Sequence, residues 1–146
     1  MNRKVLLSFL GTSNYVSCNY FTEGNPEEKI ENVRYIQEAI FKLYCTNFTA
    51  NDQVLLLLTE LAEKMNFLDD GQWSPQSKSY SASNEGLKSR FQQLQEEGFK
   101  FTLNTQRIKE GFSQEEIWSI FETIADQIQE GDTIILDITH AFRFLP

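Results

Sequence analysis

Four side chains that could contact a ligand lie close together near the end of the printed sequence. They are Asp137, Thr139, His140 and Arg143, within DITHAFRFLP. An arginine guanidinium offers a planar fork of donors to a phosphate, and the imidazole of His140 could donate to a phosphate or to a base edge. The set therefore predicts a site for a phosphorylated ligand. A local alternative is that Asp137 caps nearby backbone N–H groups and pairs with Arg143.

A second polar segment, GTSNY at positions 11–15, directly follows an apolar run. Gly11 has no Cβ and would let a ligand approach the backbone closely. Thr12, Ser13 and Asn14 add hydroxyl and amide groups. Turn chemistry alone also explains glycine, serine and asparagine at such a place. The segment fits neither the G-x-G-x-x-G nor the P-loop pattern, so it is weak evidence for a dinucleotide or nucleoside triphosphate site.

Other chemistries find little support in the residue types. His140 is the single histidine of the chain, and histidine-based metal sites use more than one. A triad drawn from Ser13, His140 and Asp137 lacks the G-x-S-x-G elbow of acyl-transfer enzymes. We therefore expect neither a metal nor a cofactor.

Length, charge and cysteine content narrow the class of protein. A chain of 146 residues suits one domain. Its net charge of -8 argues against direct binding to duplex nucleic acid, which needs a basic face. Two cysteines make no disulfide framework, which favours a cytoplasmic protein. No run approaches the roughly 20 apolar residues of a membrane span, so no membrane contact is expected.

The elements that position the two polar segments follow from the hydrophobic pattern. Apolar runs at 5–10, 54–58 and 133–136 predict buried parallel strands. Residues 15–21 predict a short extended piece, and the alternation at 99–103 predicts a further strand. Residues 69–84, with five serines and no apolar period, predict a mobile surface loop.

Helices are predicted between these strands from caps and apolar faces. One helix is predicted to begin at Pro26, Glu27 and Glu28 and to present an apolar face to the core as far as Tyr44. The residues of that apolar face are Ile30, Val33, Ile36, Ile40, Leu43 and Tyr44. The others are a helix capped by Thr59 and running to about Asn66, one over 87–94 stopped by Gly98, and one capped by Ser113 and Glu116 whose apolar stripe reaches Ile128 before Gly131.

Strands and helices therefore alternate, which predicts an α/β fold: a Rossmann-like, doubly wound and mainly parallel sheet. Ligands of such folds bind beyond the carboxyl ends of the strands, near a switch in strand order. Residues 11–15 and 139–143 both follow strands, so they face one another if those strands are neighbours. Pro146 suits the first turn of a further helix, and we expect the domain to be truncated at its C-terminus.

Taken together, these segments resemble the CARF domain (CRISPR-associated Rossmann fold) of type III CRISPR ancillary proteins. The resemblance rests on the order and spacing of KVLLSFLGTSNYVSCNYF, RYIQEAIF, QVLLLLTELAEK and GFSQEEIWSIFETIADQIQEGDTIILDITHAFRFLP. It is closest to the branch with GT-x-x-Y and D-x-TH-x-x-R-x-x-P motifs. It covers nearly the whole chain except 69–84, so residues 1–146 form a single CARF-like domain. Ala141 stands where that branch usually has glycine.

The resemblance implies a sensor that binds a cyclic oligoadenylate second messenger, usually cyclic tetra-adenylate, across the axis of a homodimer. It also implies which residues bind. Its ligand-binding positions are Gly11, Thr12, Ser13, Asn14, Tyr15, Thr139, His140, Ala141 and Arg143, with Asp137 in support.

Alternatives to a binding module remain open. A ring nuclease would cleave the same ligand without metal, with Ser13, His140 and Arg143 as its candidate catalytic residues. A truncated, non-functional remnant and a nucleotide-binding domain unrelated to CRISPR are two further alternatives. Many relatives carry a HEPN ribonuclease domain with an R-x(4–6)-H motif. No arginine occupies 133–136 ahead of His140, so that motif is absent from this sequence.

Overall fold

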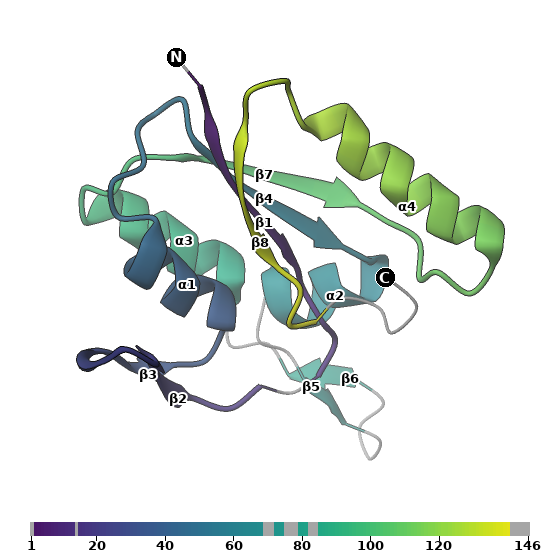
Figure 1. Ribbon diagram of the computed structural model, residues 1–146. Helices are drawn as coiled ribbons and strands as arrows, with labels where there is room; N and C mark the ends of the chain where they lie inside the picture. Colours follow the sequence, from purple (N-terminus) through teal and green to yellow (C-terminus); the bar gives the residue numbers. More distant parts are fainter. Residues whose placement is uncertain (1, 14, 69–71, 75–78, 82–84, 141–146) are drawn as a thin grey trace.

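The computed structural model describes residues 2–13, 15–68, 72–74, 79–81 and 85–140. Strands and helices alternate along most of the chain (Figure 1). The strands are β1 (Lys4–Phe9), β2 (Cys18–Thr22), β3 (Asn25–Val33), β4 (Gln53–Leu58), β5 (Gln72–Ser74), β6 (Ser79–Ser81), β7 (Thr102–Arg107) and β8 (Thr133–Asp137). The helices are α1 (Ile36–Tyr44), α2 (Glu60–Ala62), the π-helix η1 (Glu63–Phe67), α3 (Leu87–Glu96) and α4 (Gln114–Gln127).

Four of the strands form one parallel sheet in the order β7-β4-β1-β8. The chain builds outward from β1 through β4 to β7 and then returns to place β8 on the opposite side of β1. The direction of winding therefore switches between β1 and β8. This arrangement confirms the predicted Rossmann-like α/β fold, and it places the switch at the two strands that carry the polar segments.

Side chains of the sheet alternate between two apolar layers. Leu6 and Leu56 point into the layer formed with α1 and α3, whereas Leu7 and Leu57 point toward α4. In Figure 1, α1 and α3 lie on one side of the sheet and α4 lies on the other. The α1–α3 layer is centred on Phe41, whose ring contacts four other phenylalanines at centroid distances of 4.7 to 6.1 Å: Phe48, Phe91, Phe99 and Phe101.

One predicted helix is wrong over its first part. Residues 25–33, expected to be helical after Pro26, form β3, which pairs antiparallel with β2 in a separate hairpin. Proline is tolerated at the start of an edge strand, where its missing N–H costs no ladder bond. Asn32, which has a φ of 56°, lies at an irregularity of the β2–β3 pairing, and α1 begins at Ile36. The predicted apolar face is correspondingly incomplete, because Tyr44 is 55% exposed.

The remaining elements follow the predicted pattern with shifted ends. Thr59 caps α2 as expected, since its Oγ1 accepts from the Ala62 N–H at 3.2 Å. The segment then continues as a π-helix. Ser113 caps α4 through the Glu116 N–H, but the Glu116 carboxylate accepts from Gly111 rather than closing a full capping box. Within 69–84 the described residues form the short hairpin β5–β6; the rest of the predicted loop lies outside the described residues.

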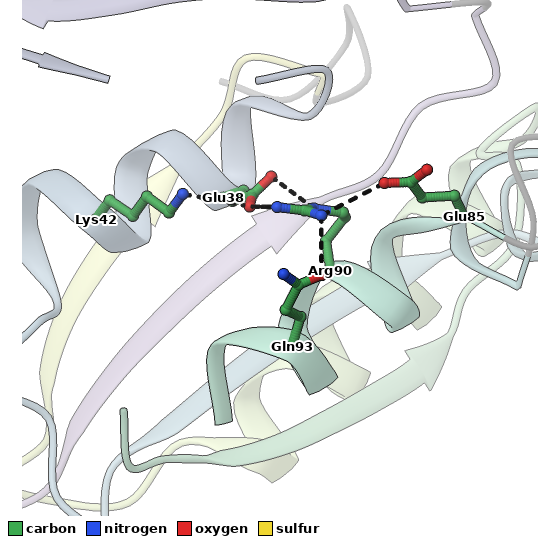
Figure 2. A network of polar contacts seen from close by, with 5 residues as sticks. All are labelled: Glu38, Lys42, Glu85, Arg90 and Gln93. Atoms are coloured by element: carbon green, nitrogen blue, oxygen red, sulfur yellow. Dashed lines mark hydrogen bonds and ion pairs between the residues drawn. The ribbon is translucent and has the colours of Figure 1, made fainter. Parts of the chain in front are cut away.

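An ion-pair network joins α1 to α3 at the surface of the α1–α3 layer. Figure 2 shows Arg90 of α3 between Glu38 of α1 and Glu85, with Lys42 and Gln93 completing the set. The Glu38 side chain is almost fully buried, and Arg90 Nη2 donates to its Oε1 at 2.7 Å. The hydrogen bond to Glu38 raises the pKa of Arg90. A buried carboxylate needs such partners, because its desolvation is costly.

Arg90→Ala should lower the free energy of unfolding by about 2 kcal/mol. The variant leaves the buried Glu38 carboxylate with Lys42 as its remaining ion-pair partner in this network, at 3.5 Å. Urea unfolding at neutral pH measures the change. Lys88→Ala, an exposed position on the same helix, is the matched control and should change stability little. Equal effects of the two variants would contradict the assigned role.

A second ion pair ties the start of β1 to the start of β8 and predicts a pH dependence. Arg3 Nη2 donates to Asp132 Oδ2 at 2.7 Å and its Nε donates to Oδ1 at 3.2 Å. The hydrogen bond from Arg3 holds the pKa of Asp132 below its ordinary value. A depressed carboxyl pKa contributes stability that is complete above the unfolded pKa of about 3.9 and is lost as the pH falls through the folded pKa.

Arg3→Ala should therefore be less stable than the unmodified protein by a constant amount between about pH 5 and 7, with the difference shrinking below about pH 4. Thermal unfolding of both proteins across that range measures it. A difference that stays constant down to pH 2 would show that the Arg3 contribution does not depend on the charge of Asp132.

No helix among the described residues is long and apolar enough to cross a membrane.

Candidate functional site

The two predicted polar segments are neighbours at the carboxyl edge of the sheet. β1 and β8 pair in parallel with Ser8 opposite Asp137, so both strands end at the same edge. We call residues 11–13 with Tyr15 the first loop and residues 138–140 the second loop. The predicted juxtaposition of these segments is confirmed for the residues that the structure describes.

Asp137 anchors the second loop to β1. Its buried carboxylate accepts from Ser8 Oγ at 2.7 Å through Oδ2, and from the Thr139 N–H at 3.0 Å and the Thr139 hydroxyl at 2.5 Å through Oδ1. The bond from the Thr139 N–H agrees with part of the alternative interpretation from the sequence, in which Asp137 caps a nearby backbone N–H group. Asp137 thus ties Thr139 of the second loop to Ser8 of β1 through its two carboxylate oxygens.

Tyr15 and His140 bring the two loops into contact. Their rings lie 4.6 Å apart between centroids at 36° to one another. The far side of Tyr15 meets Tyr35, just before α1, edge to face at 6.1 Å. Burial lowers the pKa of His140, an effect that the charge of Asp137 opposes, so its surroundings favour the neutral imidazole. Burial likewise raises the pKa of the Tyr15 hydroxyl. The contact therefore joins two uncharged rings.

Gly11 allows the Tyr15 side chain to approach the backbone of the first loop closely. A Cβ added at Gly11 would overlap the Tyr15 hydroxyl, and it would lie 3.3 Å from Tyr15 Cζ and 3.4 Å from His140 Cβ. Gly11 is thus explained by close approach within the loop pair rather than by an unusual backbone angle. Tyr15 folds back over its own loop, where hydrogen bonds with Ser13 and the Gly11 backbone partly oppose the effect of burial on its pKa.

Two residues that hold the first loop were not found by sequence reasoning. Asn66, in η1, donates from Nδ2 to the carbonyl oxygens of Gly11 and Ser13. Arg34, just before α1, donates from Nε to the Tyr15 carbonyl at 2.8 Å and lies over the Tyr35 ring at 5.1 Å. Neither residue belongs to a recognisable motif. An asparagine or arginine far from the loop in sequence gives no local signal that it will contact the loop.

The described part of the site contains seven of the ten residues predicted to bind or support a ligand. Thr12, Ser13 and Thr139 are exposed, and Gly11, Tyr15 and His140 are partly buried. The described seven are Gly11, Thr12, Ser13, Tyr15, Asp137, Thr139 and His140, whereas Asn14, Ala141 and Arg143 lie outside the described residues. No group of three or more His, Cys, Asp or Glu side chains within the described ranges is arranged to hold a metal ion.

Several surface pockets lie outside the space between the two loops, and each is lined by both acidic and basic side chains. One of about 480 Å³ lies at the opposite edge of the sheet, beside Arg3, Lys4 and Asp52. Another of about 420 Å³ lies between α4 and the ends of β4 and β7, beside Arg107 and Glu116. A third, of about 300 Å³, adjoins the first loop and is lined by Ser17, Asn32, Arg34, Tyr35, Glu38, Glu85 and Arg90. Between the two loops themselves, the Tyr15 ring occupies the space against His140.

The fold and the loop pair define a Rossmann-like α/β domain with polar loops at its topological switch, the usual position of a ligand site in this class. Comparison with protein families then identifies the chain more closely. Residues 5–146 match the family described as the CARF domain of the CRISPR system endoribonuclease Csx1. The chain belongs to this family, which confirms the resemblance drawn from its motifs.

A CRISPR-associated relative gives a shorter match. The CRISPR-associated protein MJ1674 of Methanocaldococcus jannaschii is 43% identical over 42 residues. The aligned segment covers 27% of this chain and 7% of that protein. The match is consistent with the family assignment and carries no information on the rest of the relative.

Proposed function

We propose that this domain is the sensor of a type III CRISPR-associated protein and that it binds a cyclic oligoadenylate, with cyclic tetra-adenylate as the first candidate. The proposal includes a cytoplasmic homodimer, in which the ring lies across the two-fold axis. Its support is the membership of the CARF family together with the position of the loop pair. The single observation that carries it is the Tyr15–His140 contact, which joins the two strand exits at the switch in strand order.

The chemistry of the loop pair suits such a ligand. Uncharged rings at Tyr15 and His140 offer faces on which an adenine could stack, and base stacking on aromatic side chains is a common source of affinity. The hydroxyl groups of the exposed residues Thr12 and Ser13 could bond ribose or phosphate oxygens, and the Thr139 hydroxyl, which donates to Asp137, could still accept from a ribose hydroxyl. The domain is acidic overall, so attraction to the phosphates must come from local groups such as backbone N–H and the nearby Arg34.

Calorimetric titration of the purified domain with cyclic tetra-adenylate tests the proposal, with cyclic hexa-adenylate and linear tetra-adenylate as comparisons. Saturation at one ring per two chains is the expected result, since a symmetric ring matches a symmetric dimer. Absence of heat from a demonstrably folded sample at high micromolar ligand would overturn it. Chromatography of the recovered ligand separates the remaining alternatives, because linear di-adenylate would indicate a ring nuclease and intact ring a binding module.

A further inference from the structure

We propose that Asn66 is a positioning residue that fixes the backbone of the first loop so that it presents the Thr12 N–H, and not the Gly11 carbonyl oxygen, to an anionic ligand. This inference rests on the proposed function, since it concerns the same loop pair. Asn66 is separated from that loop by more than 50 positions, and it lies on a different element.

The side-chain amide of Asn66 uses both of its donors on the first loop. Its Nδ2 donates to the Gly11 carbonyl at 2.9 Å and to the Ser13 carbonyl at 3.0 Å. Asn66 itself is 1% exposed, so water does not compete for these donors. Because both loop partners are acceptors, the NH₂ group of the amide and not its oxygen must face the loop. The contact thus fixes two carbonyls that are two residues apart.

A loop carbonyl that is held toward Asn66 directs the N–H of the following residue away from Asn66. In a trans peptide the C=O of one residue and the N–H of the next point in opposite directions, and none of the described peptide bonds is cis. With the Gly11 carbonyl bound to Asn66, the Thr12 N–H is directed away from Asn66, on an exposed residue. A phosphate would meet a donor there, and the carbonyl oxygen that would repel it is turned away.

Asn66 lies in the π-helical turn of η1. The Leu68 N–H donates to the Glu63 carbonyl at 2.9 Å, which is a bond between residues five apart. Such a turn contains one residue more than an α-turn, and one residue corresponds to a rotation of roughly 100° about the helix axis. Asn66 and Phe67 are both buried, Asn66 against the loop and Phe67 in the α1–α3 layer. Single π-turns of this kind are frequent at functional sites.

A purely structural role for Asn66 is the competing explanation, and Thr59 provides a matched control. Thr59 is buried, begins the same helical segment and caps it through its hydrogen bond from the Ala62 N–H. Thr59→Ala therefore destabilises the same segment while leaving the loop carbonyls bound. Asn66→Ala removes both bonds to the loop, and Asn66→Asp replaces the donors by oxygens that repel the carbonyls.

We expect Asn66→Ala to weaken binding of cyclic tetra-adenylate about tenfold or more, and Asn66→Asp to weaken it further, because loss of preorganisation reduces affinity. Thr59→Ala should bind within about twofold of the unmodified protein, the order of change expected when preorganisation is kept. All three are titrated at a temperature where circular dichroism shows them folded. Asn66 variants that bind as Thr59→Ala does would overturn the inference.

A second measurement does not depend on the ligand. NMR order parameters of the Thr12 and Ser13 amides should be near 0.85 in the unmodified protein and in Thr59→Ala, and should fall below about 0.6 in Asn66→Ala. Unchanged order parameters would overturn the positioning role even if the ligand binds. The two measurements can also disagree in the other direction. If Asn66→Ala loosens the loop but the unmodified protein binds no cyclic oligoadenylate, the proposed ligand is rejected and the positioning role of Asn66 is retained.

Discussion

Gly11→Ala should weaken binding of cyclic tetra-adenylate about tenfold or more, because displacing a preorganised contact of the loop pair reduces affinity. The added methyl group would overlap the Tyr15 hydroxyl, so the Tyr15 ring would have to shift, which would disturb its contact with His140. Calorimetry gives the change in affinity. Gly24→Ala, in the turn between β2 and β3, is the matched control, because nothing lies within 4 Å of the added Cβ there.

A double substitution tests whether that clash is the cause. Tyr15→Phe removes the hydroxyl and keeps the ring, which leaves contacts of 3.3 and 3.4 Å that small shifts can relieve. The chain carrying Gly11→Ala and Tyr15→Phe should therefore bind more tightly than Gly11→Ala alone. Measured with both single variants, the four proteins form a double-mutant cycle whose interaction energy reports the contact. Strictly additive effects would show that Gly11 matters for another reason.

Asp137→Ala should lower the free energy of unfolding by about 3 kcal/mol, because three hydrogen bonds to a charged acceptor are lost and the buried Ser8 hydroxyl loses its partner. Ligand affinity should fall as well, since Thr139 and His140 lose their anchor to β1. Urea unfolding and calorimetry measure the two effects. Asp126→Ala, at an exposed position of α4, is the control and should change neither.

Asp137→Asn distinguishes shape from charge at this position. The amide oxygen can still accept from Thr139, and the amide NH₂ can donate to the Ser8 hydroxyl, which also accepts. We therefore expect a smaller loss, about 1 kcal/mol. An alanine variant as stable as the Asp126→Ala control would refute the supporting role of Asp137, whereas an asparagine variant as damaged as alanine would show that the charge itself is required.

The sheet could be predicted from the sequence because its signals are local. The apolar runs of β1 and β4 leave no alternation, as strands covered on both faces require. The β2–β3 hairpin could not, because Pro26 followed by two glutamates is also a good helix start. Only the pairing of residues 25–33 with β2 decides between the two, and that pairing is a tertiary fact.

The candidate site likewise has some features that local sequence signals predict and others that depend on tertiary contacts. Its polar loop residues stand next to strong strand signals, so their position at the sheet edge was predictable, and the Tyr15 position followed from the family resemblance. The ring contact with His140, the reason for Gly11 and the part played by Asn66 were not predictable. Each depends on how side chains from distant elements meet, and no spacing in the sequence records that.

The order of the strands has a consequence for synthesis. β1 is the first of the four sheet strands to leave the ribosome and β8 is the last, yet they are neighbours, with Ser8 and Asp137 bonded across a separation of 129 positions. Contacts of such long range form late and slow the folding of a chain. The first loop therefore has no second loop beside it until β8 has been synthesised, because β8 follows β1 by about the same 129 positions that separate Ser8 and Asp137. Sensing can begin only once the segment that carries β8 has been made.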